Sequence, residues 1–337
     1  MSAISIRGVR KAFKGHEVLK AIDLEVQDQE FCVLLGPSGC GKTTLMRIVA
    51  GLETETEGDV LIGGRSVKGL PPRQRNIAMV FQNYAVFPHM TIGENIGFGL
   101  RMRKAPDKQV REQVLRAASL MHIEALLDRY AGQLSGGQRQ RVAVARALAV
   151  QPDVLLMDEP LSNLDALLRL EMRSELKGLL RELRTTTIYV THDQTEAMSM
   201  ADRIAVMHGG RIVQYEAPPA VYNHPATRFV GGFIGNPPMN FIADPATQAA
   251  LGCTPRAGLT LGVRPEELHL ATEGGLPVQA RVVEMLGASQ QVNTRVGDEL
   301  IRVSLPAQPT IVPGQALQLR AAPGAARWYN QEGDLRP

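Results

Sequence analysis

The stretch Gly36-Pro37-Ser38-Gly39-Cys40-Gly41-Lys42-Thr43 decides the fold, and it directly follows the apolar run Phe31-Cys32-Val33-Leu34-Leu35. This order predicts a buried strand, a glycine-rich turn and then a helix beginning near Thr44. Glycines let successive backbone N–H groups form an anion-binding nest, and a helix N-terminus adds partial positive charge. Lys42 supplies a full charge for the β- and γ-phosphates, and the Thr43 hydroxyl can bind Mg²⁺. The alternative is a glycine-rich turn that binds nothing. Because strand, spacing, Lys and Thr occur together, we expect residues 36–44 to bind a nucleoside triphosphate.

Length and charge restrict the class of protein. A chain of 337 residues is expected to form two domains. The net charge of +3, from 37 basic and 34 acidic residues, is too small to indicate a nucleic-acid partner. The three cysteines, Cys32, Cys40 and Cys253, form neither a disulfide framework nor a metal-ligand spacing, which fits a reducing compartment. Neither a signal peptide nor an apolar run of about 18 residues is apparent. We therefore expect a cytoplasmic protein that meets a membrane only through a partner.

The N-terminal region predicts an antiparallel sheet beside the nucleotide core. Residues 4–9 and 22–26 both alternate apolar and polar side chains, as half-exposed strands do. Phe13 lies between them, and its ring could stack on an adenine base. A buried phenylalanine of the sheet is the alternative.

Three further apolar runs end in polar residues that are able to act on a bound triphosphate. These are residues 77–81 before Gln82, residues 154–157 before Asp158 and Glu159, and residues 187–191 before His192. Gln82 can ligate Mg²⁺ or orient the attacking water, Asp158 would hold Mg²⁺, and Glu159 would polarise that water. His192 ends a predicted central strand, where open α/β sheets bind ligands, and could contact the γ-phosphate. The alternatives are that Gln82 only caps the surface end of its strand, that the acids at 158 and 159 are a solvated strand end, and that His192 is structural.

A second anion-binding turn follows a helical region. Between residues 91 and 129 apolar side chains recur at helical spacing among charged ones, which predicts a helical insert over about residues 91–150. Pro106 and Asp107 indicate the start of one of its helices. Ser135-Gly136-Gly137-Gln138 then opens a further helix, expected over Arg139–Val150, and exposes backbone donors without a lysine. An ordinary capped turn is the alternative. One active site needs one phosphate cradle, so we expect this turn to serve a nucleotide bound by another subunit. The turn Ser162-Asn163-Leu164-Asp165 suits crossing toward that subunit.

Taken in order, these motifs resemble the ATP-binding cassette family over about residues 1–235. The resemblance implies an α/β P-loop NTPase fold with a RecA-like mixed-sheet core, an antiparallel β subdomain and a helical insert. It places Phe13 where the family has an adenine-stacking aromatic, usually Tyr or Trp. It also assigns the trans-subunit signature to Leu134, Ser135, Gly136, Gly137 and Gln138, and the D-loop to Ser162, Asn163, Leu164 and Asp165.

Three stretches narrow the resemblance to a subfamily. Residues 81–90, 158–165 and 234–241 are similar to the ATPase subunits of bacterial carbohydrate importers, such as those for maltose and sn-glycerol-3-phosphate. Those subunits carry a C-terminal oligosaccharide-binding-like (TOBE) domain, and residues 259–266 and 300–305 fit one strand-rich barrel. We therefore expect an all-β regulatory domain over residues 236–337. The resemblance thins after Glu284, and the Ala/Pro/Gly-rich residues 306–326 match no part of it.

The resemblance implies an ATPase that converts ATP and water to ADP and phosphate with Mg²⁺ as cofactor. Its implied partners are a second copy of the chain, two membrane-spanning permease subunits and a solute-binding protein, at the cytoplasmic face of the inner membrane. The segment after Gln82 and the helical insert should contact the permease. Alternatives are an importer of polyamine, iron, sulfate or phosphonate, a soluble cassette ATPase of translation or DNA repair, and a purely regulatory nucleotide-binding module. The solute itself is not expected to be legible, because the ATPase does not touch it.

Overall fold

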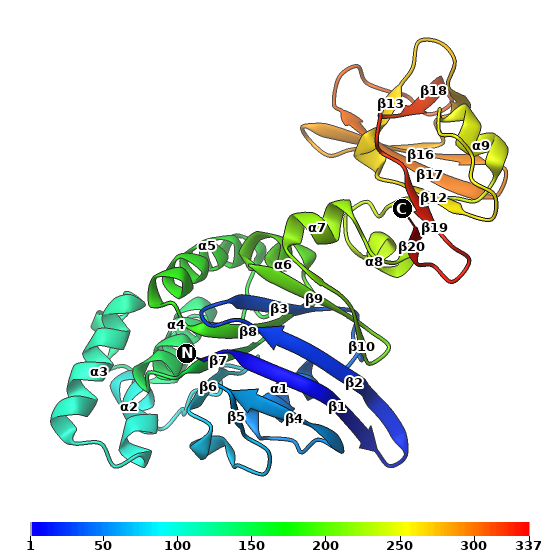
Figure 1. Cartoon of the computed structure of the whole chain (residues 1–337). Helices are drawn as coiled ribbons and strands as arrows, with labels where there is room; N and C mark the ends of the chain where they lie inside the picture. The colour runs from blue at the N-terminus through cyan, green and yellow to red at the C-terminus, as the bar shows by residue number, and fades with distance from the viewer. Residues whose placement is uncertain (1, 337) are drawn as a thin grey trace. The chain divides into compact units, whose positions relative to one another are not determined.

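The computed structural model describes residues 2–336, which form two compact units (Figure 1). The first unit ends at Pro218 and the second begins at Pro219. Each unit has its own hydrophobic core. The boundary expected at residue 235 lies after helices α7 (Pro218–Asn223) and α8 (Arg228–Phe233), whereas the second unit includes almost all of both helices. The buried Arg264 side chain explains this, because it donates hydrogen bonds to carbonyl groups of both helical segments.

The first unit contains two sheets. The antiparallel sheet has the order β2-β1-β4-β5 and consists of β1 (Ile4–Phe13), β2 (His16–Val26), β4 (Glu57–Ile62) and β5 (Arg65–Ser66). The mixed sheet has the order β10-β9-β3-β8-β7-β6 and consists of β3 (Phe31–Leu35), β6 (Ile77–Val80), β7 (Val154–Asp158), β8 (Thr186–Thr191), β9 (Arg203–His208) and β10 (Arg211–Glu216). The expected antiparallel pairing is confirmed, since Ile4 pairs with Val26 and Ile6 with Leu24.

One hydrophobic core joins the two sheets through α1 (Lys42–Ala50). Leu45, Met46, Ile48 and Val49 of this helix are fully buried against both sheets. Such burial removes several large apolar side chains from water, at roughly 1.5–3 kcal/mol each. The loop of residues 36–43 therefore leads into a helix that lies in the core between the two sheets.

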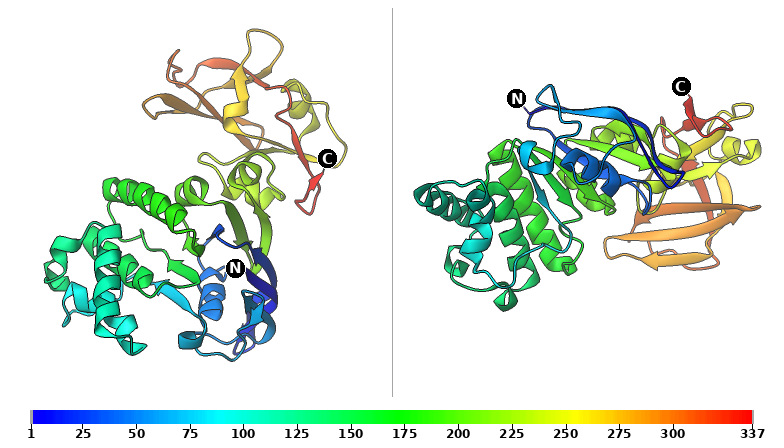
Figure 2. Two further views of the ribbon diagram at one scale, coloured as in Figure 1. Left: turned by 60° about the vertical axis from the view of Figure 1, so that its left-hand side comes forward. Right: turned by 90° about the horizontal axis from the view of Figure 1, so that it is seen from below.

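A helical insert separates β6 from β7. It comprises α2 (Ile92–Met102), α3 (Asp107–Leu120), two short 3₁₀ turns and α4 (Gly136–Ala149), and its helices pack on one another. Helix α3 begins at Asp107 behind Pro106, as the sequence predicted. Figures 1 and 2 show the cyan helices α2 and α3 grouped at one end of the first unit, away from the blue antiparallel sheet.

Five parallel strands place their carboxyl ends along one edge of the mixed sheet. Strand β3 lies beside β8, β8 beside β7, and β7 beside β6. Helices α5 (Ala166–Leu183) and α6 (Gln194–Met200) follow β7 and β8. The register aligns the strand ends by pairing Leu35 with Thr191, Asp158 with Val190 and Val80 with Met157. The residues that follow these strands therefore converge on one edge.

The second unit is mainly β-structure around a single core. Its three sheets are formed by β11 (Asn240–Ile242), β12 (Thr260–Val263), β19 (Arg327–Tyr329) and β20 (Leu335–Arg336); by β13 (Leu268–Leu270), β14 (Leu276–Gln279) and β18 (Ala316–Ala321); and by β15 (Val282–Met285), β16 (Ser289–Val296) and β17 (Glu299–Pro306). Helix α9 (Pro245–Ala250) packs at its side. The stretch 306–326, which the sequence left unassigned, contains β18. No helix among the described residues is long and apolar enough to cross a bilayer.

Candidate functional site

The loop between β3 and α1 has the backbone that its glycines require. Gly39 and Gly41 adopt φ angles of 80° and 104°, which favour glycine. A Cβ atom on Gly36 would lie 2.3 Å from the Met207 carbonyl oxygen, so the loop passes too close to β9 for any side chain. Gly41 is the N-cap of α1 and offers no side-chain cap, and the first turn holds no acidic residue. The helix N-terminus is thus left free to bind an anion.

Lys42 is anchored inside the loop. Its ammonium Nζ donates to the carbonyl oxygens of Gly36 and Pro37 at 2.8 and 3.0 Å. The Cys40 thiol lies 3.9 Å from the same nitrogen and is buried behind the loop. Lys42 is 6% exposed, so its charge is held in one place rather than spread through solvent. The loop therefore combines oriented N–H groups with a fixed positive charge.

Thr43 and Asp158 come together as the sequence predicted for a Mg²⁺ site. The Thr43 hydroxyl donates to Asp158 Oδ1 at 3.3 Å, which joins the start of α1 to the end of β7. Burial raises the pKa of Asp158, and the neighbouring Glu159 adds to this, while the bond from Thr43 opposes it. When a carboxylate is partly removed from water and lies beside a second acidic group, a nearby cation strongly stabilises its charged form.

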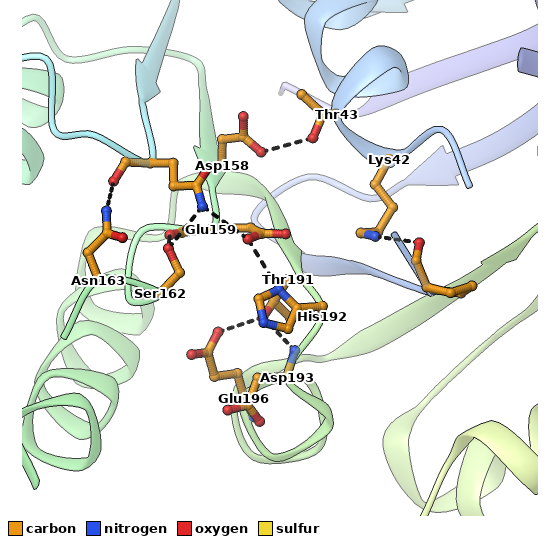
Figure 3. A network of polar contacts seen from close by, with 12 residues as sticks. Lys42, Thr43, Asp158, Glu159, Ser162, Asn163, Thr191, His192, Asp193 and Glu196 are labelled. Atoms are coloured by element: carbon orange, nitrogen blue, oxygen red, sulfur yellow. Dashed lines mark hydrogen bonds and ion pairs between the residues drawn. The ribbon is translucent and has the colours of Figure 1, made fainter. Parts of the chain in front are cut away.

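Glu159, His192 and Gln82 form one cluster at the sheet edge. Figure 3 shows Glu159 and His192 of this cluster. The Nδ1 atom of His192 lies 3.1 Å from Glu159 Oε2. The Gln82 amide nitrogen donates to the same oxygen at 3.4 Å and to Ser162 Oγ at 3.3 Å. Because the nitrogen of Gln82 faces this cluster, its amide oxygen is the atom left to bind a metal ion or a water molecule. The structure thus brings together the three residues that the sequence assigned to catalysis.

A second polar network lies behind His192, and sequence reasoning missed it. Glu196 is 3% exposed, and its Oε2 accepts hydrogen bonds from Tyr189 and Thr191 at 2.7 and 2.8 Å. The Thr191 hydroxyl accepts in turn from the Asp193 backbone N–H. Burial raises the pKa of Glu196. This network fixes the backbone on both sides of His192, and the only sequence signal was the Asp193 cap of α6.

The D-loop residues Ser162 and Asn163 point back into their own chain. Asn163 Nδ2 donates to the Gln82 carbonyl oxygen at 2.8 Å, and the Ser162 hydroxyl donates to the Glu159 carbonyl oxygen at 2.8 Å. Asp165 caps α5 by accepting from the Leu168 N–H. The turn therefore ties the loop that carries Gln82 to the segment that carries Glu159.

The Ser135 turn opens α4 with a complete capping box. Gln138 N–H donates to Ser135 Oγ, and Gln138 Oε1 accepts from the Ser135 N–H. The Ser135 hydroxyl hydrogen remains available for another acceptor. A Cβ on Gly137 would lie 2.9 Å from Leu168 Cδ2, so α4 packs closely against the Leu168 side chain of α5 at this glycine. The helix begins at Gly136, three residues before the expected Arg139.

Phe13 ends β1 with 42% of its surface exposed. The alternative of a buried sheet phenylalanine does not apply. The Lys11 ammonium lies 4.6 Å from the ring centroid. An exposed ring of this kind is able to stack on a base.

Together these features can bind a triphosphate and activate water beside its terminal phosphate. The loop of residues 36–43, the acidic pair after β7 and the cluster around His192 occupy one edge of one sheet. This fold and site define a P-loop nucleoside triphosphatase.

Comparison with known proteins gives the family. The sequence pattern of the ABC transporter family matches residues 19–162, and that of the TOBE domain matches residues 261–328. An sn-glycerol-3-phosphate import ATP-binding protein of Cereibacter sphaeroides is 51% identical over 309 residues, 88% of each chain. A protein of the same description from Rhizobium meliloti is 44% identical over 346 residues, 99% of each chain. The chain therefore belongs to the ABC transporter family, as an ATP-binding subunit that hydrolyses ATP.

Two solved structures share the fold of the first unit. One is an ATP-binding cassette described as a dimer in a post-hydrolysis state bound to ADP and Pi, with a TM-score of 0.57 and 30% identity over 64% of this chain and 98% of that one. The other is cbiO1 of Clostridium perfringens, part of the ABC transporter complex cbiONQ, with a TM-score of 0.60 and 28% identity over 65% of this chain and 89% of that one.

Proposed function

We propose that this chain is the ATPase subunit of an importer whose solute is of the sugar or glycerol-3-phosphate type. The observation that carries the proposal is the convergence of Lys42, Asp158, Glu159, Gln82 and His192 at one sheet edge in a chain 51% identical to an import ATP-binding protein. Each of these residues then has one role in the reaction.

The phosphates of ATP lie in the loop of residues 36–43, and the adenine stacks on Phe13. Lys42 exchanges its carbonyl partners for the β- and γ-phosphates. Glu159 accepts a proton from the attacking water, and His192 contacts the γ-phosphate. The contact between His192 Nδ1 and Glu159 supports this assignment, because it fixes both groups toward one point.

Magnesium fits the residues at the loop exit. Mg²⁺ prefers oxygen ligands and is commonly held by one or two side chains together with substrate phosphates and water. Thr43 Oγ1, Asp158 and the Gln82 amide oxygen provide such a set, with Thr43 and Asp158 already joined by a hydrogen bond. When bound, the ion would neutralise charge on the phosphate oxygens.

Two copies of the chain enclose two ATP molecules. The Ser135 turn, with a free hydroxyl hydrogen and the positive end of α4, binds the γ-phosphate held by the other copy. Cleavage of that phosphate removes the bridge, so the pair opens. The related cassette described as a dimer with ADP and Pi supports this arrangement.

The membrane-spanning partner docks in a groove beside the helical insert. We call this the docking groove; it has a volume of about 420 Å³, and Leu52, Phe81, Ala85, Phe87 and Phe98 are among its lining residues. Phe81, the residue before Gln82, lines the groove, so a partner seated there reaches the loop that carries Gln82. Half-buried aromatic side chains around a groove suit a helix of another protein. This groove favours the transporter over a soluble cassette ATPase.

Uptake by intact cells tests the proposal. Deletion of the gene should abolish uptake of radiolabelled sn-glycerol-3-phosphate or of a sugar, and the parent chain should restore it while Glu159→Gln should not. Spermidine, ferric iron, sulfate and phosphonate serve as comparison solutes. Loss of one of these instead would contradict the proposed solute class, and unchanged uptake of every solute would contradict the import function.

A further inference from the structure

The segment after Gln82 holds an unusual backbone. Tyr84 and Ala85 adopt φ angles of 63° and 47°, so two consecutive non-glycine residues lie in the left-handed region. L-amino acids disfavour this region because Cβ approaches the backbone carbonyl oxygen. Such a conformation persists only where the surroundings enforce it. Tyr84 is 7% exposed, which places part of this segment in the interior.

Arg146 supplies the enforcing contacts. Its Nη1 donates to the Ala85 carbonyl oxygen at 2.6 Å, and its Nη2 donates to the Tyr84 carbonyl oxygen at 3.0 Å. The guanidinium carbon also lies 5.6 Å from the Phe87 ring centroid. Burial lowers the pKa of Arg146, as expected for a cation drawn away from water to meet these carbonyls. Both left-handed residues are therefore held by one planar group.

Arg146 connects three parts of the site described above. It stands on α4, the helix that begins at the Ser135 turn. The segment that it holds carries Gln82 at one end, where Asn163 also binds the Gln82 carbonyl oxygen. At the other end Phe87 packs against Phe98 in the docking groove, with ring centroids 4.7 Å apart.

We propose that Arg146 is a positioning residue for ATP hydrolysis, which keeps Tyr84 and Ala85 in the left-handed conformation and so sets the place of Gln82. The inference rests on the proposed role of Gln82 at the metal ion or attacking water. Arg146 acts through the backbone and does not touch the nucleotide.

Arg146→Lys in the full-length chain tests this directly. One ammonium group cannot reproduce the planar fork that binds two adjacent carbonyls. We expect kcat for ATP hydrolysis to fall about tenfold, as the loss of roughly 1.4 kcal/mol of positioning would give, with the Kd for ATP changed less than about twofold. Arg141→Lys is the matched control, because Arg141 also binds a backbone carbonyl, that of Met121, from the same helix. It should keep the parent kcat.

A second substitution separates positioning from general loss of packing. Adding Ala85→Gly to Arg146→Lys should restore several-fold of the lost kcat, since glycine adopts positive φ without the steric cost. Ala85→Val keeps Arg146 but makes positive φ harder, so it should lower kcat with the Kd for ATP unchanged. Because Ala85→Val leaves the arginine in place, it tests the inference even if Arg146→Lys folds poorly.

Parent kcat in Arg146→Lys or in Ala85→Val would overturn the inference, and so would a loss in Arg146→Lys that Ala85→Gly does not reduce. Gln82→Ala is measured alongside. If it loses turnover while Arg146→Lys does not, only the role of Arg146 fails. If Gln82→Ala turns over ATP at the parent rate, the proposed role of Gln82 fails and the inference with it.

Discussion

Residue 159 combines a reactive side chain with a strained backbone. Glu159 has a φ angle of 44°, a conformation that costs a non-glycine residue of order 1–3 kcal/mol. Its N–H donates to the Val190 carbonyl oxygen on β8, and its carbonyl oxygen accepts from Ser162. These contacts stabilise the strained backbone and keep the Glu159 carboxylate next to His192. The strained backbone therefore belongs to the proposed catalytic base.

Glu159→Gln should lower kcat by about 10²–10⁴-fold, the usual contribution of a general base, and keep ATP binding. Phosphate release and equilibrium binding of a fluorescent ATP analogue measure the two effects. Glu175→Gln, which removes the ion pair with Arg141 away from the sheet edge, is the control and should retain parent turnover. Hydrolysis by Glu159→Gln at the parent rate would show that another group is the base.

The raised pKa of Asp158 predicts how the stability of the fold depends on pH. This raised pKa means that the folded chain holds this proton more tightly than the unfolded chain. Stability should therefore fall as pH rises from the ordinary value of 3.8 through the raised value. In EDTA, Asp158→Asn should unfold at a higher temperature than the parent at neutral pH, and the difference should shrink toward pH 4. An equal difference at every pH in scanning fluorimetry would contradict the assignment.

At the scale of elements, the sequence predicted those whose signals are local. The P-loop strand and helix, the start of α3 at Asp107 and the strand pairing of β1 with β2 followed from spacing, capping and alternation. Strand β18 also carried such a signal, since buried Leu317 and Leu319 alternate with polar residues, but it lies between Pro-Gly pairs in a stretch of biased composition.

The sequence did not predict the contacts between side chains and backbone groups that lie far apart along the chain. The bonds from Arg146 to Tyr84 and Ala85, and from Asn163 to Gln82, join segments about 60–80 residues apart. The Glu196 network had the same character, because a glutamate after a helix cap is ordinary on its own. Such contacts depend on packing that no periodicity encodes.

The buried Arg264 side chain joins the segments of helices α7 and α8 in the second unit. It is 1% exposed and donates to the carbonyl oxygens of Tyr222, Gly231 and Ile234. Arg264→Met would remove the side-chain donors to the Tyr222 and Ile234 carbonyl oxygens, at about 1–3 kcal/mol each, while Gly231 keeps its bond from the Met239 N–H. We expect urea unfolding of the full chain to show the second unit destabilised by roughly 3 kcal/mol or more. Arg256→Met, which removes a cation–π contact between an exposed arginine and Trp328, should cost less than about 1 kcal/mol. Equal effects of the two variants would contradict this role.

At the scale of the whole molecule, the proposed hydrolysis requires two copies of the chain to meet across ATP. The phosphate loop and the Ser135 turn are both helix N-termini with free donors, yet only the loop carries a lysine. Within one chain, the Asn163 side chain donates a hydrogen bond to the Gln82 carbonyl oxygen. A phosphate bound at the Ser135 turn of a second copy would thus affect the loop that carries Gln82. The same loop reaches the docking groove.

The molar mass of the Glu159→Gln chain, measured by light scattering with and without ATP, tests this most directly. We predict that saturating ATP and Mg²⁺ double the mass from 36.7 kDa with one ATP bound per chain. Adding Ser135→Arg should keep the chain at 36.7 kDa while it still binds ATP. A chain that stays monomeric with ATP bound, or a Ser135→Arg variant that dimerises as readily as Glu159→Gln alone, would contradict the claim that two copies share each nucleotide.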